Sequence, residues 1–272
     1  MKLQNLITST MYKRSFLAAA VAATCATSAF AAPTFTFDPS KVGLSGTAIT
    51  ADQVIISDYT NVAFTDTTHF TERGFLSFAS FQNGGTTLGN LGGLNSTYSL
   101  YIPFTGTGTL AAGATPASLT STPSFGSFDT LTYSLVGANG PTTFSIVGNT
   151  PTVTPSGGTT TLATGSLIKG SVSTSPAGGG AGFSPSANAQ VTFLQAAGVN
   201  AFFSPQPFYT TGFSSFTNVS TDVTATANGF NITNGGGTLN FGGLPTQVPE
   251  PATLALLGVG LLGLGLRKRK QA

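Results

Sequence analysis

Few side chains in this sequence are able to carry out catalysis. His69 is the only histidine of the 272 residues and Cys25 the only cysteine, so no set of zinc ligands can form. A serine nucleophile needs a base, only His69 is on offer, and no Gly-x-Ser-x-Gly turn occurs. On a strand, His69 and Glu72 point to opposite faces. We therefore predict no catalytic residue, no metal site and no cofactor, with His69 at the surface or at a strand end.

The acidic residues leave one route to catalysis open. Glycoside hydrolysis uses two carboxyl groups roughly 5–9.5 Å apart, and residues distant in sequence can form such a pair. The acids between residues 32 and 247 are Asp38, Asp52, Asp58, Asp66, Glu72, Asp129 and Asp222. Nothing in the sequence favours any pair of them. A polysaccharide-degrading enzyme therefore remains the alternative to a protein without catalytic activity.

The elements that would position these residues are predicted to be strands. Short segments rich in Val, Ile, Phe and Tyr recur at intervals of roughly 8–15 residues, with Gly, Asn or Pro between them. They lie at residues 54–56, 62–64, 75–81, 98–104, 131–136, 144–147, 190–194, 201–203, 213–219, 229–232 and 239–241. This spacing predicts an all-β body over residues 32–241, folded as a β-sandwich or a jelly roll.

Turn-forming residues suggest how some of these strands are connected. Residues 131–136 and 144–147 bracket a segment that contains Gly137, Gly140 and Pro141, which predicts a hairpin. Three stretches rich in Gly, Pro, Ser and Thr are predicted to be long loops. They span residues 110–124, 150–161 and 173–186. The body contains no cysteine, so it must be held together without disulfide bonds.

The C-terminal 25 residues, 248–272, consist of three parts that suit sorting at a membrane. A rigid proline-containing element comes first, because proline fixes φ and disfavours helix before it. An uncharged run from Ala252 to Leu266 follows, and a helix of this length reaches roughly 22 Å, less than the ~30 Å hydrocarbon core. Four basic residues then keep the C-terminus cytoplasmic. The first and last parts are Val248, Pro249, Glu250, Pro251, Arg267, Lys268, Arg269 and Lys270.

The N-terminal residues are typical of a secretory signal peptide. Lys13 and Arg14 precede an apolar, alanine-rich stretch, and Ala29 and Ala31 give the small-x-small form of a cleavage site. We predict a signal helix within residues 1–31, cleaved after Ala31, with Met11 as an alternative start. At the other end, a linker at residues 242–247 joins the body to a short transmembrane helix.

Removal of both ends reverses the charge of the chain. The full sequence has a formal net charge of +2, but residues 32–247 hold three basic and seven acidic side chains, a net charge of −4. No basic stripe is present to neutralise phosphates, so we predict no nucleic-acid partner. Gly, Ser, Thr and Asn make up much of the remaining surface, which suits contacts with carbohydrate.

The three-part tail resembles the sorting signal of PEP-CTERM proteins. The resemblance covers residues 248–272 and implies a Gram-negative bacterium that makes extracellular polysaccharide. It also implies that an exosortase, a membrane processing enzyme, recognises the Pro-Glu-Pro element and releases or transfers the protein. The chain would be exported through the inner membrane, anchored transiently by its C-terminal helix, and then found on the cell surface or in the matrix.

The body is similar to flocculation-associated PEP-CTERM proteins in three segments, at residues 35–46, 50–59 and 70–78. This resemblance implies a non-enzymatic matrix or adhesion protein that promotes flocculation and biofilm formation together with extracellular polysaccharide. No binding residue can be carried over from the family. The alternative is a secreted polysaccharide-binding or polysaccharide-degrading protein on a β-sandwich.

Overall fold

The computed structural model describes residues 34–110, 115, 118–176, 182–204, 210–217 and 223–241. These residues form strands and three short 3₁₀ helices, with no α-helix among them, so the all-β prediction is confirmed. Within this described part, no helix is long and apolar enough to cross a membrane. The predicted signal helix (1–31), linker (242–247) and sorting segment with its transmembrane helix (248–272) lie outside the described residues.

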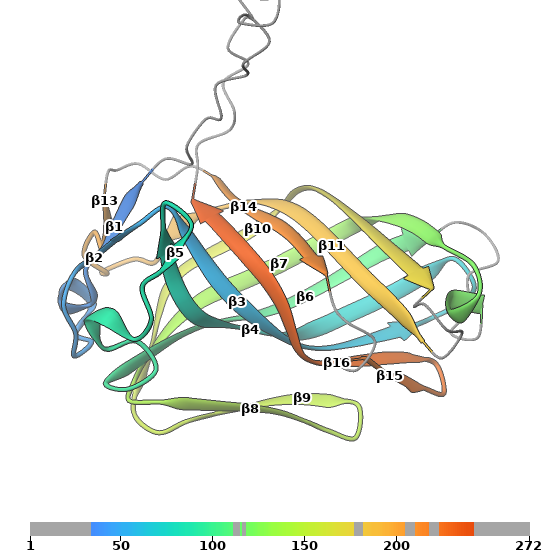
Figure 1. The fold of residues 1–272 in the computed structure, drawn as a ribbon, viewed down its shortest axis with the longest axis horizontal. Helices are drawn as coiled ribbons and strands as arrows, with labels where there is room; N and C mark the ends of the chain where they lie inside the picture. The colour runs from blue at the N-terminus through green and yellow to red at the C-terminus, as the bar shows by residue number, and fades with distance from the viewer. Residues whose placement is uncertain are drawn as a thin grey trace, which may run out of the picture. The chain divides into compact units, whose positions relative to one another are not determined.

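Eight antiparallel strands form one sheet that closes on itself (Figure 1). Each of these eight strands pairs with the next of the eight in chain order. The sheet closes because the last of them, β16, pairs with the first, β3. Closure gives every strand a partner on both sides. The eight strands are β3 (Gln53–Phe64), β4 (His69–Asn83), β6 (Tyr98–Leu110), β7 (Ser124–Asn139), β10 (Thr159–Pro176), β11 (Phe183–Thr192), β14 (Thr210–Thr217) and β16 (Gly229–Phe241).

This arrangement corrects the prediction of a β-sandwich or jelly roll. A sandwich has two packed sheets, and a jelly roll needs strands that cross from one sheet to the other. Here one sheet curls around a single core, and its strands follow chain order. The alternation of apolar and polar residues is the same in both architectures, so the pattern alone does not distinguish them.

Strand β3 shows how the sequence directs side chains to the interior. Val54, Ile56, Asp58, Thr60 and Val62 alternate along the strand and are all buried. Alternation is what a strand with one buried face requires, because successive side chains point to opposite sides. Polar Asp58 and Thr60 therefore enter the core on the same face as the apolar residues.

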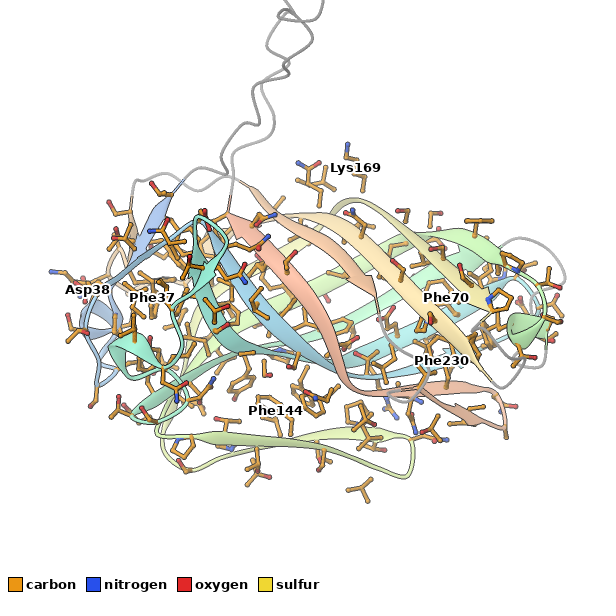
Figure 2. All side chains as sticks on the ribbon, viewed as in Figure 1. Phe37, Asp38, Phe70, Phe144, Lys169 and Phe230 are labelled. Carbon is orange, nitrogen blue, oxygen red and sulfur yellow. The ribbon has the colours of Figure 1, made fainter. Side chains whose placement is uncertain are left out.

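A small sheet packs against one end of the closed sheet. It consists of β1 (Phe35–Phe37), β2 (Ile49–Ala51) and β13 (Phe203–Ser204). The ring of Phe35 lies 4.9 Å from that of Phe241, and the ring of Phe37 stacks 5.9 Å from that of Phe81. These contacts join the small sheet to the ends of β4 and β16, and Phe37 is fully buried (Figure 2). A second aromatic group, Phe70, Phe128, Phe183 and Phe230, fills the interior further along the strands.

The predicted hairpin between β7 and the following strand is wrong. Strand β8 (Thr142–Val147) leaves the closed sheet after Gly140 and pairs with β9 (Thr150–Pro155). The two strands form a separate hairpin, β8–β9, beside the closed sheet (Figure 1). The turn signal at Gly140–Pro141 is real, but it redirects the chain away from β7 instead of folding it back.

Two of the three predicted loops are also largely strand. Residues 150–155 form β9, and residues 159–161 begin β10. Residues 173–176 end β10, and residues 183–186 begin β11. The Thr and Ser content of these segments favoured loops over strands in the sequence analysis. These strands face solvent over much of their length, so they need few apolar residues. The remaining elements are β5 (Thr86–Thr87), β12 (Leu194–Gln195), β15 (Val223–Thr226), η1 (Pro39–Val42), η2 (Leu91–Gly93) and η3 (Ser118–Thr120).

Candidate functional site

His69 occupies the surface position that the sequence predicts. It begins strand β4, and its side chain is 55% exposed. Its Nδ1 lies 2.9 Å from Asp66 Oδ2 and 3.0 Å from Thr68 Oγ1. Backbone N–H groups of Thr68 and His69 donate to Asp66 at 2.7 and 2.8 Å and hold the pKa of that carboxyl well below its usual range.

This arrangement is a turn stabilised by a carboxylate, and it does not form a catalytic relay. A relay needs one imidazole nitrogen on the nucleophile and the other on the orienting carboxylate. Here Asp66 and Thr68 both contact the same nitrogen of His69. Among the described residues, no group of three or more His, Cys, Asp or Glu side chains is placed to hold a metal ion.

Two carboxyl groups that the sequence left unselected meet inside the closed sheet. Asp58 comes from β3 and Glu72 from β4, and both line the same two interior cavities. In the strand register Asp58 lies opposite Leu76 and Glu72 opposite Val62. The Thr60 hydroxyl donates a hydrogen bond to Asp58. Of these two residues, Asp58 is buried, whereas Glu72 is partly exposed. The side chains of both border the two cavities.

Burial in an apolar interior shifts both carboxyls toward the protonated form. It raises the pKa of Asp58 to about 7, and the hydrogen bond from Thr60 only partly opposes that rise. Burial, and then the negative charge of Asp58, raise the pKa of Glu72 to about 8. Near neutral pH the two groups therefore hold protons that exposed carboxyls would have lost.

The interior space around this pair is small. One cavity of about 50 Å³ extends toward Phe70, Phe230 and Thr174, and another of about 20 Å³ toward Phe128 and Leu131. A water molecule needs roughly 10–15 Å³, so the larger cavity has room for a few waters. The Thr174 hydroxyl is buried without a protein partner, which suits a water in the larger cavity. A sugar ring does not fit between the two carboxyls.

The outer face of β3, β4 and β6 carries an aromatic cluster beneath the β8–β9 hairpin. Phe144 of β8 stacks on Tyr59 at 5.3 Å and contacts Tyr101 at 5.8 Å and Phe75 at 6.3 Å. Figure 2 shows Phe144 between the hairpin and the closed sheet. Partial burial raises the pKa of Tyr59 and of Tyr101. The cluster fixes the hairpin against the sheet.

A groove of about 400 Å³ lies between strand β9 and the outer surface of β4, β6 and β7. We call it the hairpin groove. Its lining includes three apolar rings, four hydroxyls and one charged side chain. These residues are Phe75, Pro103, Pro151, Thr105, Thr132, Ser134, Thr150 and Arg73. The groove therefore combines ring faces with hydroxyl groups in one concave surface.

Arg73 connects the closed sheet to the turn of the hairpin. Its Nη2 donates to the backbone oxygen of Asn149 at 3.3 Å. Asn231 of β16 anchors the same turn from the other side, donating to Gly148 O at 3.0 Å and to Asn149 Oδ1 at 3.3 Å. The wall of the groove is therefore held in place before any ligand arrives.

The residues predicted for sorting and cleavage cannot be placed in the structure. Ala29 and Ala31, the run from Ala252 to Leu266 and the two flanking motifs lie outside the described residues. They remain predictions from the sequence. The hairpin groove and the interior carboxyl pair were missed. For the pair a signal existed, because Asp58 and Glu72 each occupy an inward position in an alternating strand.

Comparison with known families places the chain among proteins sorted at the membrane. Residues 247–270 match the PEP-CTERM protein-sorting motif. The chain therefore carries a PEP-CTERM sorting motif, which indicates export and processing by an exosortase. Comparison of the chain with curated proteins and with solved structures gives no match.

Proposed function

We propose that this protein is an exported matrix protein that promotes cell aggregation by binding the cells' own extracellular polysaccharide, without catalysing a reaction. The observation that carries the proposal is the sorting motif at residues 247–270. It indicates that the body is delivered outside the cell. The role in aggregation follows the resemblance of residues 35–46, 50–59 and 70–78 to flocculation-associated PEP-CTERM proteins, which rests on the sequence alone. After processing, the protein resides on the cell surface or in the matrix.

The outer surface of the closed sheet supports binding to a hydroxylated polymer. Cross-strand hydroxyl pairs run along β6 and β7: Thr105 with Thr132 at 3.2 Å, and Thr107 with Thr130 at 2.8 Å. Each hydrogen bond to a sugar contributes only about 0.5–1.5 kcal/mol net. Affinity must therefore come from many copies acting on one polymer, which is the normal situation in a matrix.

The interior carboxyl pair supports the non-enzymatic part of the proposal. Asp58 and Glu72 are the pair that the alternative, a polysaccharide-degrading enzyme, would use. They border cavities of about 50 and 20 Å³, which have room for water but not for a saccharide. His69 contacts Asp66 and Thr68 within one turn, through the same ring nitrogen.

Deleting the gene tests the proposal directly. We expect dispersed cells that still secrete polysaccharide in normal amount, measured by settling and by assay of the extracellular sugar. Wild-type protein should restore aggregation. The nearly isosteric double variant Asp58→Asn, Glu72→Gln should restore it as well, because it removes both interior carboxyls and keeps their shape.

Two results would count against the proposal. A deletion strain that settles like its parent removes the role in aggregation. A double variant that is exported and folded, yet fails to restore aggregation, supports the enzyme alternative instead. His69→Ala serves as the matched control for a titratable side chain outside the interior, and it should restore aggregation fully.

A further inference from the structure

We propose that the hairpin groove binds a short acidic segment of polysaccharide, with the Arg73 guanidinium on a sugar carboxylate. This inference rests on the proposed function for the class of polymer, and it adds the site, the charge of the ligand and the residue that selects it. The groove has a volume of about 400 Å³, within the roughly 300–1,000 Å³ typical of ligand sites.

The lining of the groove matches the two chemical faces of a sugar ring. A pyranose presents a patch of C–H groups on each face and hydroxyls around its rim. Phe75, Pro103 and Pro151 provide apolar ring surface for the C–H patch. The hydroxyls of Thr105, Thr132, Ser134 and Thr150 surround these rings and can exchange hydrogen bonds with the rim.

Charge complementarity identifies the ligand as acidic. Arg73 is the only charged side chain in the groove lining. It forms no ion pair within the described part of the chain, where the only such contact joins His69 and Asp66. A guanidinium presents five N–H donors in a planar fork that matches a carboxylate, and the contact to Asn149 occupies one of them.

Arg73 is one of few positive charges in a body whose net charge is negative. The body between residues 32 and 247 is acidic overall, with Lys41, Arg73 and Lys169 as its three cations. The net charge therefore repels an acidic polymer in general, and a local positive site in a groove is needed to hold it. Lys169 is exposed on β10 and does not line the groove (Figure 2).

The groove is formed in advance, so binding requires little ordering. One wall is the closed sheet itself. The opposite wall, β9, is fixed by the aromatic contacts of Phe144 and by the hydrogen bonds of Asn231. At the other end of the hairpin, Ser99 Oγ lies 2.6 Å from Thr142 Oγ1. Preformed walls reduce the entropic cost of binding.

The test compares an acidic and a neutral trisaccharide. Trigalacturonate and maltotriose are titrated into the exported form of the protein, and binding is followed by calorimetry. We expect wild type to prefer trigalacturonate, and Arg73→Gln to lose at least about tenfold in affinity for it. Lys169→Gln makes the same charge change outside the groove and should bind within about twofold of wild type.

A second variant tests whether the hydroxyl groups of the groove contribute to binding in addition to the charge of Arg73. Thr132→Val removes one groove hydroxyl with little change of shape, so it should weaken binding of trigalacturonate while leaving the melting temperature near that of wild type. Equal affinity of wild type for the two sugars, or undetectable binding of trigalacturonate, would overturn the inference. Unchanged affinity in both the Arg73 and the Thr132 variants would overturn it as well.

These outcomes are distinct from failure of the proposed function. If the deletion strain disperses but the groove variants restore aggregation and bind like wild type, the matrix role stands and the groove assignment is wrong. If the deletion strain aggregates normally while trigalacturonate binds through Arg73, the groove is real and the aggregation role is wrong.

Discussion

At the scale of single residues, the feature that most departs from expectation is the interior pair Asp58 and Glu72. Ionised carboxylates are rarely buried without a positive partner, because desolvation disfavours the charged form. No cation lines either cavity beside this pair. The protein accommodates both groups by keeping them protonated, which the raised pKa of each expresses. Protonation of both carboxyls therefore favours the folded state.

This dependence predicts that stability falls as pH rises. In the unfolded chain the two groups ionise near 3.8 and 4.5, whereas in the folded protein Asp58 does so near 7 and Glu72 near 8. Between these values the folded state binds more protons than the unfolded state, so the free energy of unfolding decreases with pH. We expect the melting temperature to be highest near pH 4–5 and lower by at least about 5 °C at pH 8.5.

Removing one carboxyl should flatten this dependence. Asp58→Asn keeps an oxygen for the Thr60 hydroxyl and removes a titrating group, so it should melt higher than wild type at pH 8.5. Asp129→Asn is the matched control, because Asp129 is exposed on the outer face, where it accepts from Thr109. Thermal unfolding of the three proteins across pH, followed by circular dichroism, gives the comparison. A wild-type melting temperature that rises from pH 5 to 8.5 would contradict the argument.

At the scale of elements, the sequence predicts strands well and their partners poorly. Residues 54–56 and 62–64 were expected as two short segments, yet they are the ends of one continuous strand, β3. The polar residues between them looked like an interruption. In a strand with period two, Asp58 and Thr60 simply share the inward face with Val54, Ile56 and Val62.

The local sequence pattern does not predict closure of the sheet, because closure depends on pairing between strands that are far apart in the chain. Pairing of β16 with β3 joins residues as distant as Leu239 and Val54, and no short-range signal encodes that contact. The same holds for the hairpin groove, whose lining comes from β4, β6, β7 and β9. Local composition identified the hydroxyl-rich surface, whereas the position of Arg73 beside it depends on how the strands meet.

The β8–β9 hairpin offers a prediction at this scale. A two-stranded hairpin is marginal on its own, so its attachment to the closed sheet should depend on Phe144. Phe144→Ala removes contacts with three aromatic rings, and we expect the hairpin to open more often. Hydrogen exchange at residues 142–155 should accelerate by at least tenfold, while exchange in β3 and β4 changes little.

Val147 of the same strand provides the control. Its side chain is 68% exposed, so Val147→Ala removes little contact and should leave exchange within about twofold of wild type. If Phe144→Ala leaves exchange in the hairpin unchanged, the aromatic cluster does not hold it. Acceleration across β3 and β4 to the same extent would show that the hairpin is instead part of the global folding unit.

At the scale of the whole molecule, a closed sheet and an aromatic core stabilise a body that contains no disulfide bond. Closure leaves no unpaired edge among the eight main strands, which limits pairing with other chains. Aromatic side chains fill the interior and the end beneath the small sheet. The low charge of the surface leaves hydroxyls and amides for contact with a polymer.

Delivery of this body depends on the tail, and that dependence gives the last prediction. Residues 247–270 match the PEP-CTERM protein-sorting motif, in which the rigid Pro-Glu-Pro element precedes a short apolar run. Changing Pro249 and Pro251 to Ala removes the two proline rings, each of which restricts its own φ angle. We expect the double variant to accumulate unprocessed in the membrane fraction, detected by its larger size on immunoblots. Pro245→Ala, two residues before the matched segment, is the control and should be processed normally. Release of the double variant at the wild-type rate would show that the processing enzyme reads another feature of the tail.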